Sequence, residues 1–301
     1  MKGRGEISRR EMLESALAVG AVAPQLAHAF SRAAEPWRVG CYTRPWAQHE
    51  YRVALDAIAE AGFKYAGLMT TKSPNNLVIS VDTPPEEAQK VGEECRKRKL
   101  SVPSLYGGGI PVERSLEAGI QGMRRLIDNC VAARIENLMM GGVSEPNLVE
   151  PYYKAIAECC AYAREKGIGI SVKPHGGTNA TGPQCRKLIE SVGCSNFRLW
   201  YDPGNIFYYS DGKLDPVDDS PTVSGLVVGM SVKYFRMPKE VELTPGTGMV
   251  NFPKVMANLK RGGFTGGALI IECLAPGDLA ELLANAKNAR AFVESFVSGL
   301  A

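Results

Sequence analysis

Four short segments of this chain place a charged side chain at the end of an apolar, β-prone run. The runs end at Lys173, Asp202, Lys233 and Glu272, and segments with helical patterning separate them. Carboxylates and ammoniums gathered in one pocket can move a proton beside a carbonyl and stabilise the oxyanion that forms. Charged groups at the ends of successive strands of a repeating β/α chain mark the active site of a barrel enzyme. The pattern therefore predicts one active site shared by four strands.

The alternation of side chains along each run predicts which groups share a face. In the first of the four runs, Ile170 and Val172 lie on one face, while Ser171, Lys173 and His175 lie on the other. Positions that pack against helices should be apolar, so the polar face should point into the mouth of the barrel.

Strand and helix patterns alternate along the whole chain, which predicts a parallel sheet. The expected strands are 38–42, 65–69, 101–105, 137–140, 169–173, 198–202, 228–233 and 268–272. The expected helices are 51–61, 85–98, 116–133, 151–166, 183–192, 253–261 and 279–297, and 207–224 is expected to be irregular. Eight units predict a closed (β/α)8 TIM barrel, a single α/β domain over residues 30–301. A doubly wound open sheet is less favoured, because no Gly-x-Gly-x-x-Gly turn follows the first strand.

Residues 1–29 resemble a twin-arginine export signal. Arg9-Arg10 precedes an apolar stretch over 16–23, and Ala27-His28-Ala29 has the small-x-small pattern of a cleavage site. The alternative is an amphipathic surface helix. The export signal predicts a periplasmic or secreted protein. The apolar stretch is too short for a stable span, so we expect no stable membrane association after cleavage.

The composition argues against nucleic-acid binding and leaves two alternatives for the cysteines, disulfides or free thiols. The 301 residues carry a net charge of +3, too small to indicate nucleic-acid binding. The eight cysteines lack metal-binding spacing. Cys41 and Cys273 lie on the first and last strands, which are neighbours in a closed barrel, so an exported protein could pair them. Two buried thiols are the favoured alternative.

The order of several motifs resembles the xylose isomerase-like TIM barrels, which include sugar phosphate isomerases and epimerases. The resemblance covers about residues 37–298. The motifs that carry it are Lys173-Pro174-His175, Tyr201-Asp202-Pro203-Gly204-Asn205, Val232-Lys233, the stretch 245–252 (PGTGMVNF) and Ile271-Glu272. The resemblance implies a barrel enzyme that acts on a small sugar or sugar derivative as an isomerase, an epimerase or a related lyase.

The resemblance also implies a divalent metal (Mn, Mg, Co or Zn), which family members commonly hold with Glu, Asp, His and Glu from strands five to eight. The Asp falls on Asp202 and the last Glu on Glu272, but the other two positions are Lys173 and Ser231. An ammonium repels a metal ion and pairs with carboxylates. Two predictions stay open: a metal held by Asp202, Glu272 and His175, or a metal-independent site.

The expected roles follow from residue type. Glu272 or His175 would take the proton, while Lys173 and Lys233 would stabilise an enediolate-like intermediate. Aromatic residues follow strands one, three and six, and could stack on a sugar: Tyr42, Trp46, Tyr106, Phe207, Tyr208 and Tyr209. Of these, Trp46, Tyr106 and Tyr208 are predicted to bind substrate, together with Arg44 and Asn205.

Two other functions remain alternatives. Lys173 or Lys233 could form an imine, as in an aldolase-like lyase. A chain that has lost the family's metal could also be a carbohydrate-binding barrel without catalysis. Residue types alone do not predict the oligomeric state.

Overall fold

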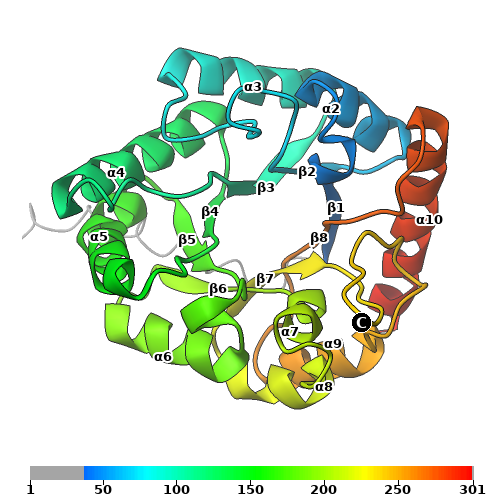
Figure 1. Cartoon of the computed structure of the whole chain (residues 1–301). Helices are drawn as coiled ribbons and strands as arrows, with labels where there is room; N and C mark the ends of the chain where they lie inside the picture. The colour runs from blue at the N-terminus through cyan, green and yellow to red at the C-terminus, as the bar shows by residue number, and fades with distance from the viewer. Residues whose placement is uncertain (1–36, 300–301) are drawn as a thin grey trace, which may run out of the picture.

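Residues 37–299 are described in a computed structural model, and they form a closed barrel of eight parallel strands in sequence order (Figure 1). The strands are β1 (Arg38–Tyr42), β2 (Tyr65–Leu68), β3 (Ser101–Tyr106), β4 (Asn137–Met140), β5 (Gly169–Val172), β6 (Phe197–Tyr201), β7 (Val227–Val232) and β8 (Ala268–Ile271). Pairing of β1 with β8, from Arg38 opposite Ala268 to Cys41 opposite Ile271, closes the sheet. The predicted TIM barrel is confirmed. The predicted export signal lies outside the described residues.

An outer ring of helices covers the barrel (Figure 1). Its members are α2 (Tyr51–Glu60), α3 (Pro85–Lys97), α4 (Leu116–Ala133), α5 (Pro146–Glu165), α6 (Gly182–Val192), α7 (Pro203–Tyr209), α8 (Pro216–Asp219), α9 (Phe252–Arg261) and α10 (Leu279–Ser298). The stretch 207–224, predicted to be irregular, contains the end of α7, the short helix α8 and a 3-10 helix (Ser220–Val223). Helix α5 begins at Pro146 and contains Pro151, where the sequence predicted its start. Proline in a helix costs one backbone hydrogen bond, so the sequence favours a boundary there.

Large side chains fill the inside of the barrel and form a floor beneath its mouth. This inner cluster contains Tyr42, Met69, Met139, Trp200, Ala268 and Ile270. Two glycines on the strands make room for its rings. A Cβ atom at Gly67 would lie 2.1 Å from the Tyr42 ring, and one at Gly229 would lie 2.2 Å from the Trp200 ring. Space for a ligand is therefore confined to the mouth.

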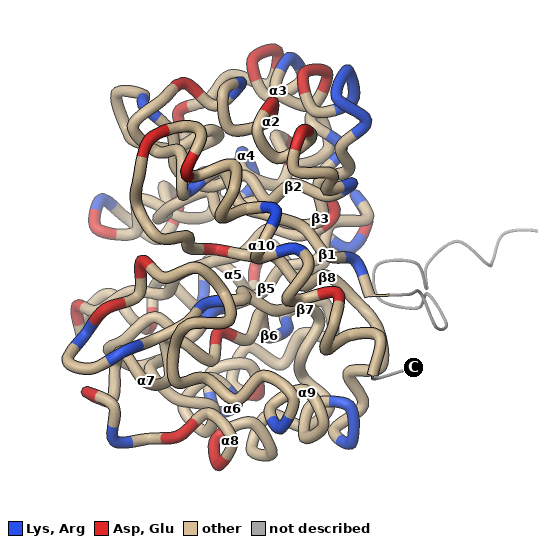
Figure 2. Tube along the Cα trace, turned by 90° about the vertical axis from the view of Figure 1, so that its right-hand side faces the viewer, with Lys and Arg blue, Asp and Glu red and all other residues tan. Residues whose placement is uncertain are grey.

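Acidic and basic residues alternate over the outer helices, as Figure 2 shows. No helix among residues 37–299 is long and apolar enough to cross a membrane. All eight cysteines are free, and both Cys41 and Cys273 are buried. The favoured expectation of two buried thiols at these positions therefore agrees with the structure.

Candidate active site

Each of the four predicted charged residues is the first residue after its strand. Lys173 follows β5, Asp202 follows β6, Lys233 follows β7 and Glu272 follows β8. The sequence placed them inside the strands, and the structure ends each strand one residue earlier. Because parallel strands in a barrel end at one face, all four side chains meet at the carboxyl-terminal mouth.

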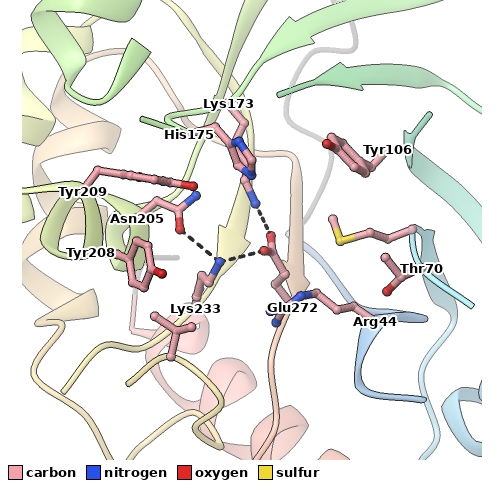
Figure 3. A pocket seen from close by; sticks show the side chains of 12 residues that line it. Arg44, Thr70, Tyr106, Lys173, His175, Asn205, Tyr208, Tyr209, Lys233 and Glu272 are labelled. Atoms are coloured by element: carbon pink, nitrogen blue, oxygen red, sulfur yellow. Dashed lines mark hydrogen bonds and ion pairs between the residues drawn. The ribbon is translucent and has the colours of Figure 1, made fainter. Parts of the chain in front are cut away.

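The four side chains form one ion-pair network, which we name the charge cluster. Lys173 Nζ lies 2.6 Å from Glu272 Oε2 and 3.0 Å from Asp202 Oδ2. Lys233 Nζ lies 2.9 Å from Glu272 Oε1 and 4.0 Å from Asp202 Oδ2. The four residues are between 0% and 6% exposed. Glu272 therefore spans the two ammoniums, one on each carboxylate oxygen (Figure 3).

Helix α7 fixes one side of the charge cluster. Asp202 is its N-cap, and its Oδ1 accepts a hydrogen bond from the Asn205 backbone N–H at 2.9 Å, with Pro203 at the first helical position. The Asn205 side chain uses both of its polar atoms within the protein. Its Oδ1 accepts from Lys233 Nζ at 3.0 Å, and its Nδ2 donates to the Pro174 carbonyl at 2.6 Å. Asn205 therefore lines the cavity, as predicted, and also positions Lys233.

Burial and pairing oppose each other in the charge cluster. Burial alone would raise the pKa of Glu272, but Lys173, Lys233 and Arg44 hold it well below its usual range. Burial would lower the pKa of Lys233, but Glu272 and Asp202 raise it above its usual range. The pKa of Asp202 is raised, mainly by burial, although both lysines oppose that shift. Glu272 and Lys233 therefore stay charged at neutral pH.

A cavity of about 240 Å³ opens above the charge cluster. Its walls contain most of the residues predicted for the site: Arg44, Tyr106, Lys173, His175, Asn205, Tyr208, Lys233 and Glu272. Tyr209 also lines it, whereas Tyr42, Trp46 and Phe207 do not. The cavity is also lined by Met69, Thr70 and Val241, which the sequence did not indicate as site residues. The first two directly follow the end of β2, a position that the barrel fold marks even for an uncharged residue.

His175 lies between two tyrosines at the rim of the cavity. Its ring centre is 6.5 Å from that of Tyr106 and 5.7 Å from that of Tyr209. The residue as a whole is exposed. Partial burial of the imidazole and the charge of Lys173 lower its pKa from 6.5 to about 4. His175 is therefore an uncharged proton acceptor at neutral pH.

Two predicted substrate residues have different surroundings from those expected. Trp46 is 1% exposed and packs in the layer between strands and helices, so it cannot stack on a ligand in the cavity. Arg44 lines the cavity, but its guanidinium pairs with Glu242 and donates to the Cys273 sulfur. Burial would lower the pKa of Arg44, but the neighbouring Cys273, Glu272 and Glu242 raise it.

A family model described as xylose isomerase-like TIM barrel matches residues 55–295. The chain belongs to the xylose isomerase-like TIM barrel family. Solved structures with the same fold include a D-psicose 3-epimerase in the presence of D-fructose. It is 14% identical, has a TM-score of 0.68, and the match covers 86% of this chain and 99% of that one.

Two further structures of the same fold extend this comparison. An L-ribulose 3-epimerase is 15% identical with a TM-score of 0.68, covering 88% of this chain and 95% of its own. A xylose isomerase domain protein from Planctomyces limnophilus is 16% identical with a TM-score of 0.66, covering 88% and 98%. No curated protein sequence matches the chain. At these identities the likeness establishes the fold alone.

The charge cluster does not fit the metal that xylose isomerase-like barrels commonly hold. The carboxylates of Asp202 and Glu272 both face ammoniums, and Ser231 is fully buried where the family has its histidine. Within residues 37–299, no three His, Cys, Asp or Glu side chains are grouped to hold a metal ion. Among these residues, the predicted grouping of Asp202, Glu272 and His175 around a metal is therefore not present, and the two carboxylates face lysine ammoniums instead.

Proposed function

We propose that this protein is a sugar isomerase or epimerase that moves a proton beside a carbonyl and uses two lysines where relatives use a metal. One observation carries the proposal: Lys173 and Lys233 are held on the two oxygens of Glu272 at the floor of the cavity. Family membership and the epimerases of the same fold support the substrate class. The ligand is a small sugar or sugar derivative.

The two ammoniums would stabilise the oxygen of the substrate carbonyl. When the adjacent carbon loses its proton, the C–H electrons form a C=C bond and negative charge develops on that oxygen. Lys173 and Lys233 are fixed by Glu272 and Asn205 before the substrate arrives, so little reorganisation is needed. Loss of one such preorganised donor typically costs about 10²–10³ in rate.

His175 is the better proton acceptor of the two that the sequence predicted. Glu272 binds both lysines and its lowered pKa makes it a weak base. His175 is uncharged above a pKa of about 4 and lies at the rim. Negative charge on the enediolate would favour the protonated imidazole, which then returns the proton. Return of this proton by His175 to the former carbonyl carbon gives isomerisation, whereas epimerisation requires delivery of a proton to the original carbon from its opposite face.

The imine-forming alternative has less support from the site. A Schiff base requires a free amine, and the raised pKa of Lys233 keeps that side chain protonated. Lys173 Nζ is also in contact with two carboxylates, at 2.6 Å and 3.0 Å. A lysine used for electrostatic stabilisation fits these contacts better than a lysine used as a nucleophile.

Solvent exchange tests this proposal directly. The protein, treated with EDTA, is incubated in D2O with ketohexoses, and NMR follows deuterium at the carbon beside the carbonyl. We expect incorporation by the wild type, and its loss in Lys173→Met and His175→Asn. Binding without exchange would indicate a carbohydrate-binding barrel. A borohydride-trapped adduct on Lys173 or Lys233 would indicate the lyase instead.

Export of the protein is a separate proposal, supported by the Arg9-Arg10 pair and the Ala27-His28-Ala29 pattern. The mature chain would begin near Phe30. Changing Arg9 and Arg10 to lysine should leave uncleaved precursor in the cytoplasm, as measured by cell fractionation and mass spectrometry. Normal export of that variant would refute a twin-arginine signal.

A further inference from the structure

We propose that a second, polar groove beside the cavity binds a second sugar unit, so that the substrate is a glycosylated ketose rather than a free monosaccharide. This inference rests on the proposed function and names its substrate class. The groove has a volume of about 460 Å³ and lies over the segments that follow β1 and β2. We call it the side groove, and its polar lining includes Gln48, Thr71, Lys72 and Asn76.

The side groove adjoins the cavity. Arg44 and Thr70 line both, and Val241 and Glu242, consecutive in the segment after β7, line one each. The cavity alone, at about 240 Å³, is below the roughly 300–1,000 Å³ typical of small-molecule sites. A ligand whose first ring sits on the charge cluster can therefore extend past Arg44 into the side groove.

The side groove carries hydrogen-bonding groups that the protein does not use itself. Gln48, Lys72 and Asn76 are exposed, and within residues 37–299 their side chains form no hydrogen bond or ion pair with other side chains. Asn76 has a φ of 58°, and its carbonyl accepts from the Thr71 backbone N–H at 3.2 Å, which fixes its place on the groove wall. Amide and ammonium groups of this kind bind sugar hydroxyls.

Among the described residues that line the side groove, Lys72 is the one cation without an ion pair, so its ammonium can donate to a ligand hydroxyl. The Arg44 guanidinium is paired with Glu242, so the strongest cation of the groove is already balanced. Among the described residues, the aromatic rings that line these two spaces (Tyr106, His175, Tyr208 and Tyr209) all belong to the cavity, and none lines the side groove. This division suits a first ring held by stacking and charge and a second ring held by hydroxyl contacts.

Binding of matched sugars tests the inference. Calorimetry compares D-fructose with three glucosyl-fructoses that keep the ketone free: turanose, leucrose and isomaltulose. We expect the wild type to bind at least one of them about tenfold more tightly than fructose. The double variant Lys72→Ala, Asn76→Gly should lose that preference and keep its affinity for fructose, because two hydrogen-bonding groups are gone. Glycine at 76 keeps the left-handed backbone.

Lys64→Ala is the matched control, since it removes an exposed lysine at the start of β2, at the other end of the barrel. It should retain the preference. Equal affinities for all four sugars, or an equal loss for fructose in the double variant, would overturn the inference. Failure to bind any of the four would also overturn it. Deuterium exchange with other ketoses then shows whether the proposed function still stands.

Discussion

The two halves of the barrel mouth differ in the residue that follows each strand. After β1 to β4 these residues are uncharged: Thr43, Met69, Gly107 and Gly141. After β5 to β8 every one is charged: Lys173, Asp202, Lys233 and Glu272. The first half contributes shape and hydrogen-bonding groups, including those of the side groove. The second half contributes the groups that can stabilise charge, so the two sides of one ring of strands offer a ligand different chemistry.

Burying the charged groups of the half formed by β5 to β8 costs free energy of folding, and the uncharged half has no such cost. Two ammoniums and two carboxylates are taken out of water, and apolar residues of similar volume often stabilise such a site equally well or better. Removing one partner is worse, because it leaves an uncompensated buried charge, at a cost of about 3–5 kcal/mol. The charge cluster is therefore better explained by function than by stability.

The largest expected effect comes from breaking the charged half. Lys173→Met should reduce turnover by about 10²–10³ because one stabilising ammonium is lost. It should also lower the free energy of unfolding by about 3–5 kcal/mol, measured by urea titration. Met139→Leu, in the inner cluster under the uncharged half, is the control and should cost less than about 1.5 kcal/mol. Near-normal activity of Lys173→Met would contradict the assignment of charge stabilisation to the half formed by β5 to β8.

A second prediction concerns metal binding in the charged half. Lys173→Glu places a third carboxylate beside Asp202 and Glu272, which restores a ligand position of the family. We expect affinity for Mn²⁺ to rise by about tenfold or more over the wild type in calorimetry, whereas Lys173→Met gains little. Tight, stoichiometric Mn²⁺ binding by the wild type would contradict the argument that the lysines replace the ion.

Asn205 offers a smaller and more specific test. Asn205→Ala removes the acceptor that holds Lys233 Nζ at 3.0 Å and the donor to the Pro174 carbonyl. Hydrogen bonds to charged groups contribute about 1.5–3 kcal/mol. We expect kcat to fall by about tenfold with little change in KM, because a positioning residue does not touch the substrate. A rise in KM at constant kcat would show instead that Asn205 binds the sugar.

The smallest expected effect is a pH dependence of stability from His175. Its pKa falls from 6.5 to about 4 on folding, so between these values the unfolded chain binds more protons than the folded one. Stability is then fully present above pH 6.5 and is lost as the pH falls toward 4. Because the imidazole is partly exposed, we expect no more than about 1 kcal/mol. Unfolding curves at pH 7 and 4.5 should show this difference in the wild type and a smaller one in His175→Gln.

The barrel and the charge cluster were both predictable from the sequence, for local reasons. Strand and helix periods are properties of neighbouring residues, and a lysine or glutamate that ends an apolar run is visible without a structure. Strand ends differed by one residue in six of the eight strands, and in β6 and β7 the first residue differed as well. In β5 to β8 the charged residue lies just past the last residue of the strand.

The features of the site that the sequence did not predict are set by contacts between distant segments of the chain. Trp46 follows β1 as a site residue should, yet it turns into the outer core. Asn205 lines the cavity, but nothing in the sequence indicated that its amide also contacts Lys233 and the Pro174 carbonyl. No sequence pattern marked Thr70 as a site residue, because an uncharged residue becomes part of a site only through the residues that surround it.

Gly204 has a consequence for how this barrel can change its substrate. It lies at the start of α7, directly after Asp202 and Pro203, and a Cβ atom there would lie 2.6 Å from the Lys233 carbonyl oxygen. The link between β6 and α7 thus has no slack for insertions or larger side chains. The long connection between β7 and α9 forms part of the cavity wall through Val241, and its residues 236–240 are exposed. New specificities, in evolution or by loop grafting, should therefore arise there, while the turn at Gly204 stays fixed.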